Sequence, residues 1–114
     1  RAADCGITGR ETVEALDANR PLFERMEAVR LKAGALMGMG DVTKSVTPKI
    51  GLIAPPAGAN AHFAARYFMP WTTHPTLAVT GSQCLASCAL MPGTVAEGVA
   101  KPIPPSPAGL NCRH

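Results

Sequence analysis

The clearest hydrophobic pattern in the chain runs from residue 21 to residue 37. Apolar side chains recur there at the three- and four-residue spacing of one helix face: Leu22, Met26, Val29, Ala33 and Leu36, with Phe23 beside them. This spacing predicts an amphipathic helix with one side on a core. Pro21 suits its first turn, and Gly38 and Gly40 suit its end. The charged residues between the apolar ones are expected to form a solvated face: Glu24, Arg25, Glu27, Arg30 and Lys32.

Two apolar segments further along have the character of strands. Residues 49–54 form a short apolar run, and residues 61–69 alternate, with Phe63 and Tyr67 on one face and Arg66 on the other. A short loop containing glycine joins the two segments. The pattern predicts an antiparallel hairpin.

A third apolar region has hardly any polar positions. Residues 83–91 form an apolar run that follows an extended segment at residues 74–79 and a Thr-Gly-Ser turn at residues 80–82. A helix that is apolar nearly all round belongs inside a protein, so this one is expected to be buried. With a possible short strand at residues 110–114, the order of elements predicts an α+β fold.

The start of this apolar helix is the best candidate for a binding site. The first turn of a helix presents unpaired backbone N–H groups and a partial positive charge, which suit a carboxylate or phosphate. Thr80 and Gly81 would offer their amides, and Ser82 a hydroxyl. The alternative is that Thr80 or Ser82 only caps the helix.

Composition narrows the class of protein. The chain has 114 residues, enough for one domain, and 46% of them are apolar. A net charge of +3 without a basic cluster, and only five aromatic residues, argue against nucleic-acid binding. No apolar run approaches the roughly 20 residues of a membrane span. The start at Arg1 shows neither a methionine nor a signal-peptide pattern, so we expect a piece of a longer, cytoplasmic protein.

The four cysteines are too sparse for a disulfide scaffold. Cys84 and Cys88 are four residues apart and share a helix face. The three histidines are scattered, so a zinc site is not predicted and no metal ligand is assigned. Both cysteines are expected to be small buried core residues.

Several segments resemble the family of PrpF-type proteins, which includes 2-methylaconitate isomerases, methylitaconate isomerase and 4-oxalomesaconate tautomerase. The N-terminal segment RAADCGITGRE is similar to the family's RAADLGLTGxE. The similar segments lie in matching order over essentially the whole chain: residues 1–11, 27–30, 37–41, 48–49, 66–70, 74, 78–81 and 91–95.

The resemblance implies a fold like that of diaminopimelate epimerase. Such proteins have two similar halves, each a sheet wrapped around a central helix, with the active site in the cleft between them. Residues 1–114 would form a partial C-terminal domain whose partner, the N-terminal half, is missing. The apolar helix would be its central helix, and the end at Arg113 and His114 resembles the start of the family's HPSG segment.

The resemblance also implies a reaction, a proton shift that moves a double bond in an unsaturated di- or tricarboxylic acid such as 2-methylaconitate, aconitate or 4-oxalomesaconate. No metal or organic cofactor is needed. The epimerases carry a catalytic cysteine just before the matching turn, where this chain has Val79. The family's catalytic lysine and cysteine belong to the first half. No catalytic residue is therefore assigned, and the chain alone is expected to be inactive.

The substrate-binding residues assigned on this basis are Thr80, Gly81, Ser82 and His74. His74 could donate to a carboxylate, or be satisfied in a polar loop. Arg66 is a weaker candidate, and a solvated strand arginine is the favoured interpretation. Lys44 and Lys49 are expected to stay clear of the substrate. The alternative function is a non-catalytic carboxylate-binding or interaction module.

Overall fold

The computed structural model describes residues 1–102 and 112–113. After a short 3₁₀ turn at Ala3–Cys5 come the helices and strands of an α+β domain: α1 (Val13–Asp17), α2 (Arg20–Leu36), β1 (Ile50–Ala54), β2 (Phe63–Met69), β3 (Thr72–Thr73), α3 (Val79–Leu90) and β4 (Cys112–Arg113). The strands β1, β2 and β3 are antiparallel neighbours, and β4 pairs with β2 in parallel. Among the described residues, no helix is long and apolar enough to cross a membrane.

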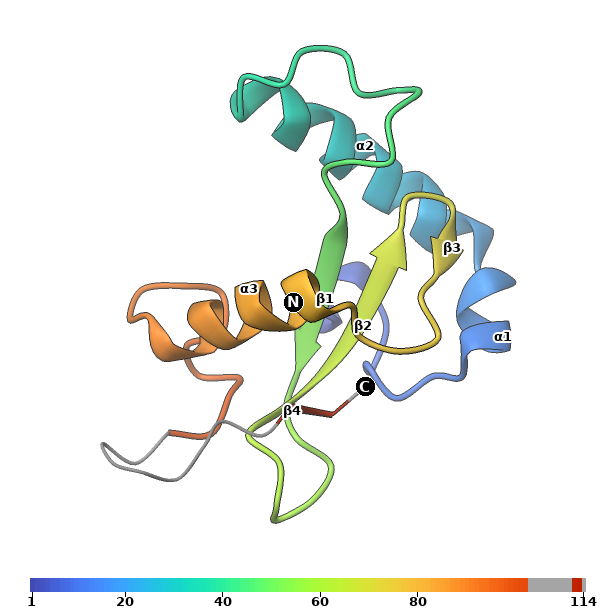
Figure 1. Ribbon diagram of the computed structural model, residues 1–114. Coiled ribbons are helices and arrows are strands. Elements are labelled where there is room, and N and C mark those ends of the chain that lie inside the picture. The colour runs from blue at the N-terminus through green and yellow to red at the C-terminus, as the bar shows by residue number, and fades with distance from the viewer. Residues whose placement is uncertain (103–111, 114) are drawn as a thin grey trace.

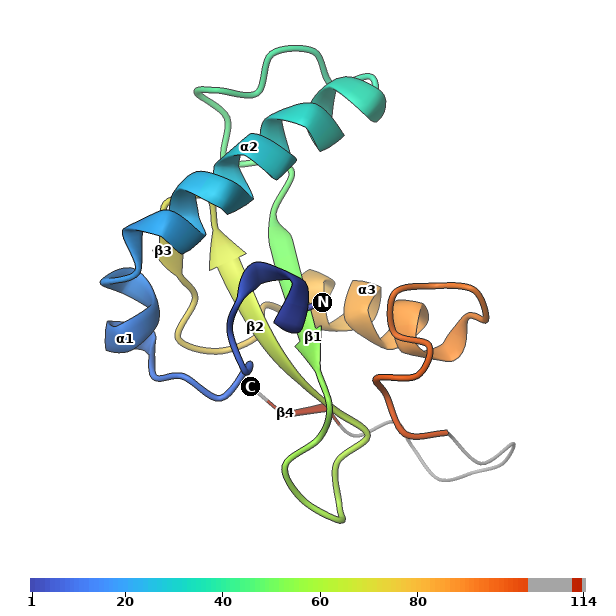
Figure 2. The same cartoon turned by 180° about the vertical axis from the view of Figure 1, so that it is seen from behind.

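The sheet separates two hydrophobic clusters. Figures 1 and 2 show α3 crossing one face of β1 and β2, while α1, α2 and the N-terminal turn cover the other face. Leu22 and Met26 of α2 pack with Leu52 and Phe68 on the α2 face. Leu85 of α3 packs with Ile53 of β1 and with Phe63 and Ala65 of β2 on the α3 face. Successive residues of a strand therefore belong to different clusters, because their side chains point to opposite faces of the sheet.

The predicted hairpin and amphipathic helix are confirmed. Gly51 pairs with Tyr67 and Ile53 with Ala65 in the antiparallel register of β1 and β2. The helix predicted over residues 21–37 is α2, whose N-terminus is capped by the Asn19 side chain. It ends at Leu36, and the positive φ of 75° at Gly38, just after the C-cap Met37, allows the closing bonds of a Schellman motif. The short strand expected near the C-terminus is present as β4, although residues 110, 111 and 114 lie outside the described part.

The prediction that Arg30 belongs to a solvated face is wrong. Arg30 is 1% exposed, whereas Val29 and Leu36, which were expected to face the core, are 57% and 82% exposed. The Arg30 guanidinium donates to the Glu27 carboxylate at 2.7 Å. It also donates to backbone carbonyl oxygens in the loop that leads to β1, at Val42, Ser45 and Thr47. The loop wraps over the helix, so a charged side chain is buried with its donors paired.

The expectation that the apolar helix is buried is also wrong in this chain. Only Gly81 and Leu85 of α3 are buried, and Val79 is 77% exposed. The sheet of the described strands covers one side of α3, and nothing described covers the other (Figure 1). Cys84, expected in the core, is therefore exposed, and Cys88 is half-buried.

The N-terminal segment that carries the family resemblance folds around the carboxylate of Glu11. The backbone amides of Thr8, Gly9 and Arg10 donate to its two oxygens at 2.6, 2.9 and 3.0 Å, and the Thr8 hydroxyl donates at 2.9 Å. Partial burial alone would raise the pKa of Glu11, but these hydrogen bonds bring the pKa below its ordinary value. The charged form of Glu11 therefore stabilises the fold.

Replacing Glu11 by glutamine is expected to lower the free energy of unfolding by about 1–3 kcal/mol at pH 7, because amide donors lose a charged acceptor. The pKa of Glu11 is lower in the folded than in the unfolded chain. The stabilisation by its charged carboxylate is therefore complete above the unfolded pKa of about 4.3, and it is lost as the pH falls through the folded pKa. Urea unfolding of the chain and of Glu11→Gln between pH 3 and 7 measures this. Glu24→Gln, on an exposed part of α2, is the control and should change little. A Glu11→Gln deficit that persists unchanged at pH 3 would contradict the account.

Candidate functional site

A groove of about 410 Å³ lies where the first turn of α3 meets β1 and β2. Its lining residues are Thr47, Lys49, Gly51, Tyr67, Thr80, Gly81, Cys84 and Leu85. They come from the end of the loop after α2, from the strands β1 and β2, and from α3. None of them is a carboxylate, whereas Lys49 supplies a positive charge. The groove is therefore suited to an anion.

Two close contacts set α3 against the sheet and form the groove. A Cβ built on Gly81 would lie 2.7 Å from Tyr67 Cζ and 3.1 Å from the Tyr67 hydroxyl oxygen. A Cβ on Gly51 would lie 2.9 Å from a methyl carbon of Leu85. Real Cβ atoms do not approach other atoms so closely. The absence of side chains at these two positions thus lets the helix lie directly on the strands.

The first turn of α3 has no side-chain cap. Thr80, Gly81 and Ser82 lie inside the helix, not in a turn before it, and the N-cap is Ala78 in extended backbone. The interpretation of Thr80 or Ser82 as a cap is therefore wrong. The Ser82 amide and hydroxyl both bond to the Ala78 carbonyl oxygen, at 2.8 and 2.9 Å. The amides of Val79, Thr80 and Gly81 have no acceptor within the helix.

His74, also assigned to substrate binding, lies beside the groove and not in its lining. The His74 amide donates to the Tyr67 carbonyl, and the two rings meet edge to face at 5.8 Å. Its Nδ1 faces the backbone of Thr76, which donates to it at 3.1 Å. His74 thus flanks Tyr67 and does not line the groove. Its environment is that of a histidine satisfied in a polar loop, the alternative to carboxylate binding.

Arg66 lies on the opposite face of the sheet. Its Nε donates to the Glu11 carbonyl at 3.1 Å, so it does not line the groove and is unsuited to binding a carboxylate there. Lys44 remains in the exposed loop and does not line the groove either. His114, which resembles the start of the family's HPSG segment, lies outside the described residues.

Of the eight residues that line the groove, sequence reasoning assigned only Thr80 and Gly81 to binding. Lys49 was expected to stay clear of a ligand, Tyr67 was assigned only to a strand face, and Cys84 was assigned to the core. The register of β1 and β2 places Gly51 opposite Tyr67, two residues after Lys49. A signal was present in the alternation of residues 61–69, which put Tyr67 on the face that α3 covers.

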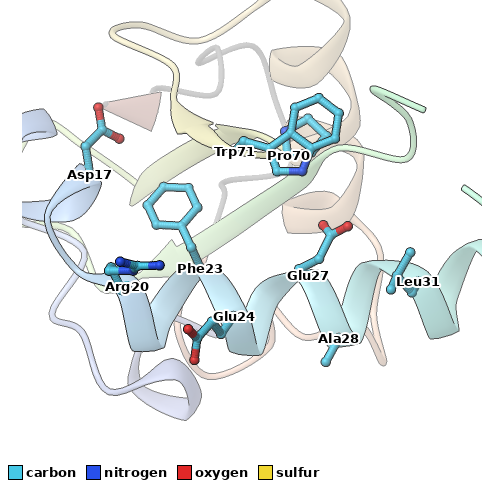
Figure 3. Close-up of a pocket in the computed structure, with 9 residues that line it drawn as sticks. All are labelled: Asp17, Arg20, Phe23, Glu24, Glu27, Ala28, Leu31, Pro70 and Trp71. Carbon is cyan, nitrogen blue, oxygen red and sulfur yellow. The ribbon is translucent and has the colours of Figure 1, made fainter. Parts of the chain in front are cut away.

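A larger cavity of about 590 Å³ lies on the other face of the sheet and has the opposite charge. Figure 3 shows Phe23 and Glu27 rising from α2 toward Pro70 and Trp71. The cavity is lined by three carboxylates, those of Asp17, Glu24 and Glu27, and by one cation, Arg20, among apolar side chains. It therefore disfavours an anion despite its size. In the described part of the chain, no group of three or more His, Cys, Asp or Glu side chains could hold a metal ion.

The chain matches the PrpF protein family over residues 1–107. It is 45% identical over 100 residues to the (4E)-oxalomesaconate Delta-isomerase of Novosphingobium sp. (strain KA1), covering 88% of this chain and 28% of that protein. It is 37% identical over 99 residues to the 4-oxalomesaconate tautomerase of Pseudomonas putida, covering 87% and 27%.

A crystal structure of methylitaconate-delta-isomerase superposes with a TM-score of 0.86 at 25% identity, covering 93% of this chain and 32% of that one. The α+β arrangement is therefore that of a solved isomerase. The chain spans less than a third of the length of each of these relatives.

Replacing Gly81 by alanine tests the close contact that forms the groove. Alanine favours a helix by about 1 kcal/mol over glycine, but the added methyl would collide with the buried Tyr67 ring. Overpacking of this kind costs about 1–3 kcal/mol, so a net loss of stability is expected in urea unfolding. Gly58→Ala, where no atom lies within 4 Å of the new methyl, is the matched control. A stabilised Gly81→Ala variant would show that α3 does not pack this closely.

Proposed function

Because the chain belongs to the PrpF family, we propose that it forms part of a cofactor-independent isomerase. The reaction is a proton transfer that shifts a double bond in an unsaturated di- or tricarboxylic acid of the 2-methylaconitate, aconitate or 4-oxalomesaconate type. Relatives named as an oxalomesaconate Delta-isomerase, a 4-oxalomesaconate tautomerase and a 3-methylitaconate isomerase support this class of substrate.

The observation that carries the proposal is the uncapped start of α3 in a groove without carboxylates. The amides of Thr80 and Gly81 are the proposed anchor for one carboxylate group of the substrate. A hydrogen bond to a charged acceptor contributes about 1.5–3 kcal/mol, so two of them suffice to orient a small acid. Ser82, whose hydroxyl is bonded to Ala78, and His74, which flanks Tyr67, would act at most through these neighbours.

This chain is proposed to bind the substrate. The rest of the protein is proposed to supply the acid and the base that transfer the proton. The proposed arrangement is one half of a two-half fold like that of diaminopimelate epimerase, with the substrate held between the halves. The exposed side of α3 agrees with this arrangement, because further strands would cover it as a sheet wraps around the helix.

Thr80→Pro tests the amide anchor. Proline removes the N–H of the second residue of α3, and α2 already carries Pro21 at its own second position, so the helix start can accept it. We expect the affinity for trans-aconitate to fall about tenfold in isothermal titration calorimetry, the loss of one charge-assisted bond.

Thr80→Ala is the matched control, because it removes the hydroxyl and keeps the amide. It should bind within about threefold of the unchanged chain, a difference below 1 kcal/mol. Circular dichroism checks that both variants keep their helix content. Equal affinities of Thr80→Pro and the unchanged chain would contradict the amide anchor.

Isomerisation by the 114-residue chain alone is expected to be undetectable. The absorbance of the conjugated double bond follows the reaction with aconitate-type acids, with a full-length relative as the positive control. Turnover by the chain alone would show that its own residues supply the acid and base, and would overturn the division of roles proposed above.

A further inference from the structure

Tyr67 has a buried ring, and its hydroxyl is paired with no described residue. Its side chain is 8% exposed and lies in the groove. The hydroxyl oxygen keeps contact with solvent at the groove, since among the described residues the fully enclosed side-chain oxygen that lacks a partner is Thr73 Oγ1. The contact with Gly81 puts the ring beside the first turn of α3. The hydroxyl is thus available as a donor beside the amides of Thr80 and Gly81, which have no acceptor within the helix.

Lys49 is a cation without a counter-ion at the same groove. It precedes β1, its side chain is exposed, and it forms no ion pair within the described residues. The residue before β1 and the first turn of α3 both contribute to the lining. The groove thus offers two kinds of anion partner on different elements, a lysine ammonium and a set of neutral donors.

We propose that Tyr67 and Lys49 are the residues that select ligands with more than one carboxylate, an inference that rests on the function proposed above. The Tyr67 phenol donates to the carboxylate that the amides of Thr80 and Gly81 hold. The Lys49 ammonium binds a second carboxylate of the same molecule. An acid with one carboxylate uses the first position only.

If Tyr67 and Lys49 bind different carboxylates, their replacement should affect two probes differently. The probes are trans-aconitate, with three carboxylates, and crotonate, with one. Tyr67→Phe keeps the ring against Gly81 and removes the hydroxyl, so it should weaken both probes by a similar factor of about ten. Lys49→Met should weaken trans-aconitate by about tenfold and leave crotonate within twofold. Lys44→Met, which removes an equal charge away from the groove, is the matched control and should change neither.

Nuclear magnetic resonance titration of the 114-residue chain and its variants gives the affinities, and the spectra check that each variant is folded. If Thr80→Pro weakens trans-aconitate while Tyr67→Phe and Lys49→Met do not, the amide anchor stands and this inference fails. If Lys49→Met weakens both probes equally, or no more than Lys44→Met does, the assignment of Lys49 is overturned. If the unchanged chain binds neither probe, both the proposed function and this inference fail.

Discussion

The contact between Gly81 and Tyr67 is the constraint on which the site depends. Because Gly81 has no side chain, the first turn of α3 lies directly on the ring of a residue in the central strand β2. This contact fixes where the first amides of the helix are directed, and it buries the Tyr67 ring while its hydroxyl bonds to no described residue. A larger residue at either Gly81 or Gly51 would lift the helix and open the groove.

Two polar clusters hold the scaffold around this contact. The Arg30 guanidinium ties the loop before β1 to α2, and Thr47 at the end of that loop both accepts from Arg30 and lines the groove. The amides around Glu11 fix the N-terminal segment, and Arg1 at its start donates to the carbonyls of Val95 and Glu97 beyond α3. The segments that carry the family resemblance are therefore joined in space, although more than 80 residues separate them.

The sequence predicted the elements better than it predicted their environment. Helix and strand periods depend on local spacing, so α2 and the β1–β2 hairpin could be recognised from residues 21–37 and 49–69. The burial of Arg30 depends on a loop 12 to 17 residues further along the chain, which supplies carbonyl acceptors. The spacing of apolar and charged residues within α2 therefore could not predict this burial. The exposure of α3 depends on how much sheet surrounds it. The alternation of residues 61–69 gives the face of Tyr67, but the meeting of Tyr67 and Lys49 with the first turn of α3 depends on where the helix crosses the strands, which periodicity alone does not give.

Binding of a carboxylate by the backbone amides at the start of α3 is the proposal on which the assigned role of this chain depends. The most direct measurement is the change in amide proton chemical shift across the ¹⁵N-labelled chain as trans-aconitate is added. The account predicts that the largest saturable changes occur at Thr80 and Gly81, with small changes at the start of α2, where the Asn19 side chain already caps the helix. Changes at the start of α2 that equal or exceed those at Thr80 and Gly81 would contradict it.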